Sequence, residues 1–388
     1  MELMKLEPLP ASSLPAAVAS LAASATPAKV MAARGMAPLR PTELLIAVYQ
    51  LSFDDDATVR VAAEAAPGTL PDKVVLAPLA EPLPPQVLHF FAGHLPASRR
   101  QAIEKILYNQ ATADETFVEL ARRLEESELE IIFQNEVRLL RCPELVSTLY
   151  LNKRARMSSV SRALELCVRN HVRLEGIPGF DELAATLLAD PNAATPSTPD
   201  AAFAAAVIEN ESPDAPALAS TELNLALAGE GEDDLVDDLD EAMEGAKQEK
   251  SGGPIKFDEL KIFEKIRLAT VGNRYCRQVL IRDTNKIVAM SVVRSPSITD
   301  MEIIAAAGSR TVCDDVIRFI ANNRVYIKDY AVKHALVNNP KCPLGNSLRL
   351  LSFLHMEDLK ALGRSKNIPS ALSIAAKKLI NTRSGGRR

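Results

Sequence analysis

The feature that most constrains this chain is a short frame that recurs through its C-terminal third. In each copy, three polar or small residues precede one apolar residue, and a segment with apolar residues at helical spacing follows. The copies begin at Asn273, Thr284, Ser295, Ser309, Arg324, Asn339 and Ser365, at separations of 11, 11, 14, 15, 15 and 26 residues. The usual separation accommodates a turn and a helix of about two to three turns. Since one such helix cannot bury its apolar stripe alone, the pattern predicts a stack of short helices.

The N-terminal half shows the same organisation. Asn109-Gln-Ala-Thr112 and Asn152-Lys-Arg-Ala155 resemble the C-terminal frames. Thr112, Ser127 and Thr299 are each followed three residues later by a glutamate, which is the spacing of a capping box that opens a helix. Alternating strand patterns between glycine-rich turns are missing from the sequence. We therefore expect an all-α protein, built as an irregular α-solenoid of short helical repeats.

Charge divides the chain into three regions. Residues 1–189 carry 19 basic and 23 acidic side chains, residues 190–253 carry 2 and 16, and residues 254–388 carry 24 and 11. The middle region is rich in Ala, Pro, Asp, Glu and Gly, and Phe203 is its only aromatic residue. Such a segment cannot bury enough apolar surface to offset its ordering entropy. We expect it to be a disordered acidic linker between two helical modules.

These contrasts set the expected domain boundaries. The expected regions are an Ala/Pro-rich segment over 1–27, a helical repeat module over 28–189, the linker over 190–253, a basic helical repeat module over 254–382 and a basic flexible tail over 383–388. The sequence leaves open whether the two modules stack into one superhelix or swing freely, because a linker of about 60 residues spans roughly 40–45 Å as a coil.

One stretch of the acidic region has a helical pattern. Leu235, Leu239 and Met243 recur four residues apart between aspartates and glutamates, so they would share one face of a helix. One interpretation is a linear motif that folds on a partner. The other is a solvated acidic spacer with scattered apolar residues.

Two segments carry a resemblance to known repeat families. Asp56-Ala-Thr-Val-Arg-Val-Ala-Ala63 resembles the Asp-x-x-Val-Arg-x-x-Ala motif of HEAT-type repeats, and Asn338-Asn-Pro-Lys-Cys-Pro343 resembles the Asn-Pro turns of leucine-rich variant repeats. The spacing of the repeats departs from both families in its irregularity. The resemblance implies a curved helical stack with a binding surface and brings no catalytic residues.

Residue patterns that support catalysis or metal binding are missing from the sequence. It has no phosphate-binding glycine loop, no HExxH, no GxSxG and no CxxC, so we expect a protein that is not an enzyme and that has no metal or cofactor. Cys276 and Cys342 take the apolar position of their frames, which predicts that they are buried in the core. Cys142 precedes Pro143 at an expected helix start, where a structural role is favoured over a reactive one. Five unpaired cysteines favour a reducing, cytoplasmic location.

The basic residues of the C-terminal module form the strongest indication of function. Ten of them recur near turns and helix starts, where equivalent positions of a solenoid stack into a stripe. They are Arg267, Arg274, Arg277, Arg282, Lys286, Arg294, Arg310, Arg318, Arg324 and Lys328.

We therefore hypothesise a non-enzymatic scaffold or adaptor that binds a protein partner through its helical-repeat surfaces. The alternative is a nucleic-acid-binding protein that uses the basic C-terminal module, with the acidic linker as an autoinhibitory mimic of phosphate. A solvated basic face without a ligand also stays open. No apolar run reaches the roughly 18 residues of a membrane-spanning helix, so no membrane association is expected.

Overall fold

The computed structural model describes residues 4–189, 200–207, 257–365 and 368–385. Within these ranges the regular elements are all helices, and no strand occurs. The prediction of an all-α protein is therefore confirmed for the described part of the chain.

The helices are short and closely spaced. The N-terminal half contains η1 (Ala11–Ser13), α1 (Ala16–Ala22), α2 (Thr26–Ala33), α3 (Pro41–Leu51), α4 (Ala57–Thr69), α5 (Asp72–Leu79), α6 (Pro85–His94), α7 (Arg100–Tyr108), α8 (Asp114–Ala121), α9 (Glu126–Phe133), α10 (Glu136–Arg141), α11 (Pro143–Leu151), α12 (Met157–Arg169) and α13 (Phe180–Ala189). A separate helix, α14, spans Asp200–Val207. The C-terminal half contains η2 (Phe257–Glu259), α17 (Ile262–Val271), α18 (Arg274–Leu280), α19 (Lys286–Val293), α20 (Asp300–Gly308), α21 (Asp314–Asn322), η3 (Tyr326–Lys328), α22 (Tyr330–Asn338), α23 (Leu344–Leu351), α24 (Met356–Arg364) and α25 (Ser370–Gly385).

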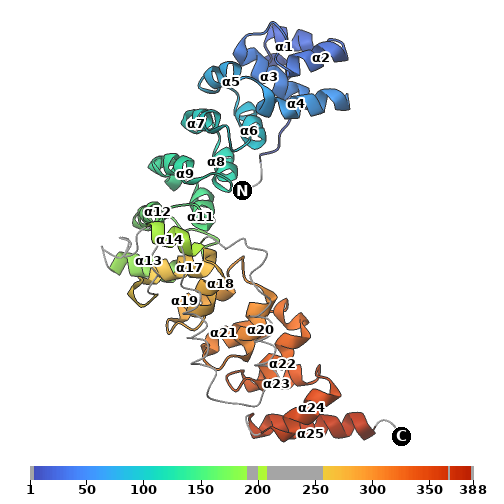
Figure 1. Cartoon of the computed structure of the whole chain (residues 1–388), viewed down its shortest axis with the longest axis vertical. Coiled ribbons are helices and arrows are strands. Elements are labelled where there is room, and N and C mark those ends of the chain that lie inside the picture. The colour runs from blue at the N-terminus through green and yellow to red at the C-terminus, as the bar shows by residue number, and fades with distance from the viewer. Residues whose placement is uncertain (1–3, 190–199, 208–256, 366–367, 386–388) are drawn as a thin grey trace, which may run out of the picture.

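Helices pack mainly on the helix two places further along the chain. In one row α3 contacts α5, α5 contacts α7 and α7 contacts α9, while in the other α4 contacts α6, α6 contacts α8 and α8 contacts α11. The C-terminal half repeats this order, with α17 on α19, α19 on α21 and α20 on α22. Figure 1 shows the helices following one another in chain order along the long axis of the molecule.

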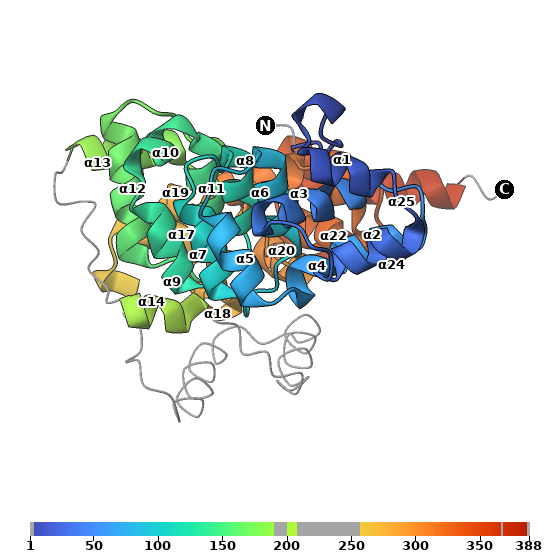
Figure 2. The ribbon, with the colours of Figure 1, turned by 90° about the horizontal axis from the view of Figure 1, so that it is seen from above.

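The two halves are in direct contact. Helix α17 packs on α11, and α14 packs on both α12 and α17. The buried apolar residues form one cluster that runs from Leu9 to Ala376 and includes both halves. Seen from above, the halves lie over one another instead of side by side (Figure 2). The C-terminal helices thus continue the stack begun by the N-terminal helices.

Three asparagine turns each hold the end of one helix against the end of an earlier helix in the same row. The Asn109 amide donates to the carbonyls of Leu79 (2.7 Å) and Glu81 (2.8 Å) at the end of α5. Asn152 donates to Ala121 (2.7 Å) at the end of α8, and Asn339 donates to Ala307 (2.8 Å) at the end of α20. A helix end leaves carbonyls without intrahelical partners, and these asparagines satisfy them.

The oxygen of each of these asparagines accepts the backbone N–H two residues on, so the turn itself is fixed as well. The Asn109 oxygen accepts from the Ala111 N–H (3.0 Å), the Asn152 oxygen from the Arg154 N–H (2.8 Å) and the Asn339 oxygen from the Lys341 N–H (2.9 Å). The frames found in the sequence at these positions therefore end one helix and brace an earlier one. The frames at Asn273 and Thr284 instead begin helices, because Asn273 and Asn285 cap α18 and α19.

Of the three expected capping boxes, the one at Thr299 forms and those at Thr112 and Ser127 do not. Thr299 and Glu302 form the expected box, in which the Glu302 carboxylate accepts from the Thr299 N–H at 2.8 Å. Thr112 does not cap α8, because its hydroxyl donates to the Ile106 carbonyl at 2.7 Å and the helix begins at Asp114. Ser127 lies inside α9 and is not its cap.

Several expected boundaries also need correction. Residues 200–207 of the expected linker form α14, with Phe203 and Val207 both 1% exposed in the core. The prediction of disorder is wrong for this part, and the rest of 190–253 lies outside the described residues. At the N-terminus, α1 packs on α3 and α2 packs on α3 and α4, so the stack begins before residue 28. At the C-terminus, Arg383 belongs to α25 and donates to the Leu354 carbonyl at 2.7 Å.

Candidate functional site

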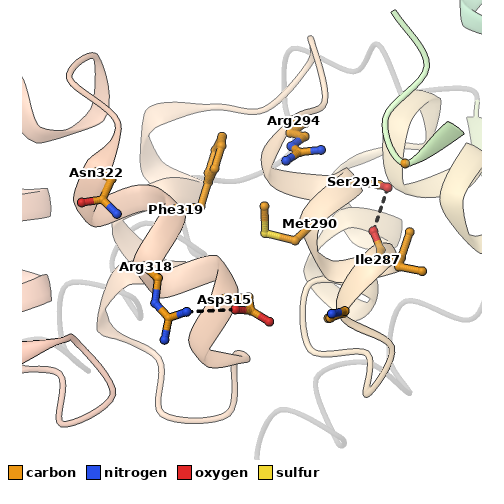
Figure 3. A pocket seen from close by; sticks show the side chains of 10 residues that line it. Ile287, Met290, Ser291, Arg294, Asp315, Arg318, Phe319 and Asn322 are labelled. Carbon is orange, nitrogen blue, oxygen red and sulfur yellow. Dashed lines mark hydrogen bonds and ion pairs between the residues drawn. The ribbon is translucent and has the colours of Figure 1, made fainter. Parts of the chain in front are cut away.

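A surface pocket of about 400 Å³ lies between α19 and α21. Its charged lining residues are Lys286, Arg294, Asp315 and Arg318. Ile287, Met290 and Phe319 supply apolar surface, and Gly179, Ser291 and Asn322 complete the lining. Figure 3 shows Met290 and Arg294 on one side of the pocket and Phe319 of α21 on the other.

Helix α19 brings three of these side chains to one side. The Asn285 side chain accepts from the Ile287 N–H at 2.9 Å and so fixes the first turn. The following helix buries Val288, Ala289, Val292 and Val293 against the core. Lys286, Met290 and Arg294 recur every four residues and line the pocket, where the two cations are exposed and Met290 is half-buried.

Helix α21 presents the facing wall by the same principle. Its first turn carries Asp314 and Asp315, a placement that the helix dipole favours. Val316, Ile317, Ile320 and Ala321 form its buried stripe, which leaves the other side of the helix for the pocket. That side carries Asp315, Arg318, Phe319 and Asn322.

The N-terminal half contributes one residue to the pocket. Gly179 has φ +69°, a left-handed backbone conformation that glycine adopts without a steric penalty, and it lies immediately before α13. The pocket is therefore formed by residues from both sides of the acidic region.

Electrostatically the pocket has an excess of positive charge. Three cations line it against one carboxylate, and the Arg318–Asp315 pair is exposed and 3.5 Å apart, so it binds only weakly. The guanidinium carbon of Arg294 lies 5.5 Å from the centroid of the Phe319 ring. This stacking positions a cation beside apolar surface while the Arg294 residue stays exposed to solvent.

The structure changes the expected basic stripe. Arg267 is 0% exposed and Arg277 is 3% exposed, so neither belongs to a binding surface. Arg277 is instead paired with buried Glu302 at 3.0 Å, and Arg267 joins the two halves of the stack. Both were indistinguishable from exposed arginines in the sequence, because their partners come from distant turns.

Eight of the ten predicted basic residues are exposed. They are Arg274, Arg282, Lys286, Arg294, Arg310, Arg318, Arg324 and Lys328. The pocket brings together Lys286, Arg294 and Arg318, and the other five lie outside its lining. The predicted linear motif of Leu235, Leu239 and Met243 lies outside the described residues.

Sequence reasoning missed the apolar half of the site. Ile287, Met290 and Phe319 look like core residues, yet each is only half-buried. The sequence shows that they share helical spacing with Lys286, Arg294 and Arg318. It does not show which side of each helix faces the core, because neighbouring helices decide that.

The predicted burial of two cysteines is confirmed. Cys276 is 1% exposed and Cys342 is 6% exposed. Burial raises the pKa of Cys276 to about 11 and also raises that of Cys342. Cys142 stands at the start of α11, and burial outweighs the helix end there and raises its pKa as well.

Comparison with protein-family models, curated proteins and solved structures found no significant match to the chain. Across the described ranges, no group of three or more His, Cys, Asp or Glu side chains has an arrangement that could hold a metal ion. In that same part of the chain, none of the helices combines the length and apolarity required to cross a bilayer.

Proposed function

We propose that this chain is a non-enzymatic scaffold of the α-solenoid class, related in design to HEAT-type or leucine-rich variant repeats. It binds an acidic segment of a protein partner in the pocket between α19 and α21. The five free cysteines favour a cytoplasmic setting for this role.

The observation that carries the proposal is the stacking of Arg294 on Phe319 beside Met290. A carboxylate of the partner would meet Arg294 and Lys286, and an adjacent aliphatic side chain would contact Met290 and Phe319. Charged contacts at a partly exposed site steer association, while burial of apolar surface adds most of the affinity.

Nucleic acid is the less favoured ligand. A phosphate backbone is followed by a continuous row of cations, and burial of Arg267 and Arg277 interrupts the expected row. Met290 and Ile287 offer no stacking platform for bases, and Arg294 already lies over the ring of Phe319. The eight exposed basic residues nevertheless justify including nucleic acid in the test.

Three labelled probes of equal net charge separate these ligands. They are an acidic peptide with one central leucine, an all-acidic peptide and a single-stranded oligonucleotide. We expect the full-length chain to bind the leucine peptide most tightly, and Arg294→Glu with Arg318→Glu to weaken that binding by about tenfold or more.

The matched control is Arg282→Glu with Arg324→Glu, which reverses two exposed charges outside the pocket and should change binding little. Tightest binding of the oligonucleotide, weakened equally by both double variants, would refute the proposal and favour nucleic acid.

A further inference from the structure

Helix α14 is a short helix that lies across the junction of the two halves. It contacts α12 of the N-terminal half and α17 of the C-terminal half. Five of its eight residues are alanines, so only Asp200, Phe203 and Val207 offer larger side chains. A helix of this length is marginal by itself and depends on the surface that it covers.

Both ends of α14 make polar contacts with other helices. The Asp200 carboxylate accepts from the Ser158 N–H (3.0 Å) and from the Ser158 hydroxyl (2.6 Å) in the first turn of α12. This is the contact that an N-terminal cap would supply, and α12 has no side-chain cap from its own preceding residue. At the other end, the Ala206 carbonyl accepts from the Asn273 N–H at 3.1 Å, where α18 begins.

The centre of α14 is apolar. Phe203 and Val207 lie four residues apart on one face, and both are 1% exposed. The Arg267 guanidinium carbon lies 4.7 Å from the centroid of the Phe203 ring. The surface under α14 therefore has a carboxylate site, an aromatic site and an aliphatic site at helical spacing.

This surface does not require α14 for its own assembly. Arg267 donates to the carbonyls of Tyr150, Asn152 and Ala155, none of which belongs to α14. Helices α11 and α17 also touch directly. Contacts that do not involve α14 therefore also join the two halves and line the surface that α14 covers.

We propose that the groove over α12, α17 and α18 is a helix-binding site, and that α14 is its resident ligand in cis. Its partner is a protein helix that carries Asp, Phe and Val at the first, fourth and eighth positions. This inference is independent of the pocket between α19 and α21. Three contacting side chains give α14 a modest hold, so a partner helix with the same pattern and further contacts displaces it.

The probe is a fluorescent peptide with the sequence of residues 198–209. It is titrated against the full-length chain, against a Phe203→Ala, Val207→Ala double variant and against Ala205→Ser, which changes an exposed position of α14. In the unmodified chain the tethered helix competes at an effective concentration on the order of mM. We expect the double variant to bind the peptide at least tenfold more tightly than the unmodified chain, and Ala205→Ser to behave as unmodified.

The control peptide carries Phe203→Ala and should bind neither protein. Circular dichroism shows whether the double variant is folded. If it is not, Asp200→Asn replaces it, and we expect a smaller increase in peptide affinity. Equal binding to the unmodified and variant chains, or no binding to a folded variant, would make α14 a fixed part of the core and overturn the proposal. A dimer of the unmodified chain that the peptide dissociates would assign the groove to α14 of a second copy instead.

Discussion

The guanidinium of Arg267 donates to the carbonyl of Ala155 at 2.7 Å, across 112 residues of sequence. The asparagine turns make the same kind of bond to an earlier helix end over 30, 31 and 32 residues. Arg267 therefore continues this series of capping contacts across the acidic region. This side chain, together with the packing of α17 on α11, joins the helices on either side of that region.

We predict that Arg267→Met lowers the free energy of unfolding by about 2–4 kcal/mol, because two buried carbonyls and one partly buried carbonyl lose their donor. Burial lowers the pKa of Arg267 to about 10, so the side chain is still charged at neutral pH. Urea denaturation followed by circular dichroism measures the loss. Arg274→Met changes an exposed arginine of α18 and is the control. An equal loss in both variants would contradict the bridging role.

Asn339→Leu should destabilise the chain by about 2–3 kcal/mol. The side chain is 3% exposed and donates to Ala307 and Ser309, and its loss leaves these carbonyls and the Lys341 N–H without partners. The neighbouring Asn338 bonds only within its own helix, to His334, so Asn338→Leu is the matched control. Thermal unfolding of the two variants compares them, and similar melting temperatures would show that the turn contributes little.

His89 should make the protein sensitive to mild acid. Its ring lies 3.0 Å from the Thr116 hydroxyl, and burial lowers its pKa below the usual 6.5 in spite of Glu119 nearby. The unfolded chain therefore binds a proton near pH 6.5 that the folded chain does not, and stability falls as the pH drops through that value.

The measurement is the free energy of unfolding at pH 7.5 and at pH 5.5. We expect His89→Asn to reduce the difference between the two values, and His171→Asn, at an exposed position, to leave it unchanged. An undiminished difference in His89→Asn would assign the acid sensitivity to other groups.

One thiol should react faster than the other four. Cys142, Cys167, Cys276 and Cys342 are buried, and burial raises the pKa of each, to about 11 for Cys167 and Cys276. Cys313 is only half-buried. A thiol reagent should therefore modify one equivalent quickly in the native protein, and Cys313→Ser should abolish this phase. Rapid loss of several thiols would contradict the packing of the cores.

Helical periodicity and the frames were enough to predict the all-α architecture, because each helix is specified by residues within a few positions of one another. The same local information placed Cys276 and Cys342 in the core. It assigned the capping box at Thr299 correctly, yet misassigned Thr112, whose hydroxyl is engaged by the preceding helix. A capping box is predicted correctly from sequence only when no other group engages the side chain of the expected cap.

Composition gave a wrong prediction where a few buried residues decide the structure of an alanine-rich segment. The alanine-rich surroundings of Phe203 predicted an unstructured linker, but α14 forms there and buries Phe203 beside Arg267, with Val207 buried as well. A composition average cannot register a single contact whose partner lies in another half of the chain.

The sequence by itself determined that this chain forms short helices with apolar stripes and that its C-terminal part is basic. Only the tertiary structure decided that Arg294 lines a pocket while Arg267 is buried at a junction, since both are arginines near helix turns. The physical reason is that burial depends on carbonyls and rings supplied by other helices, here up to 117 residues away.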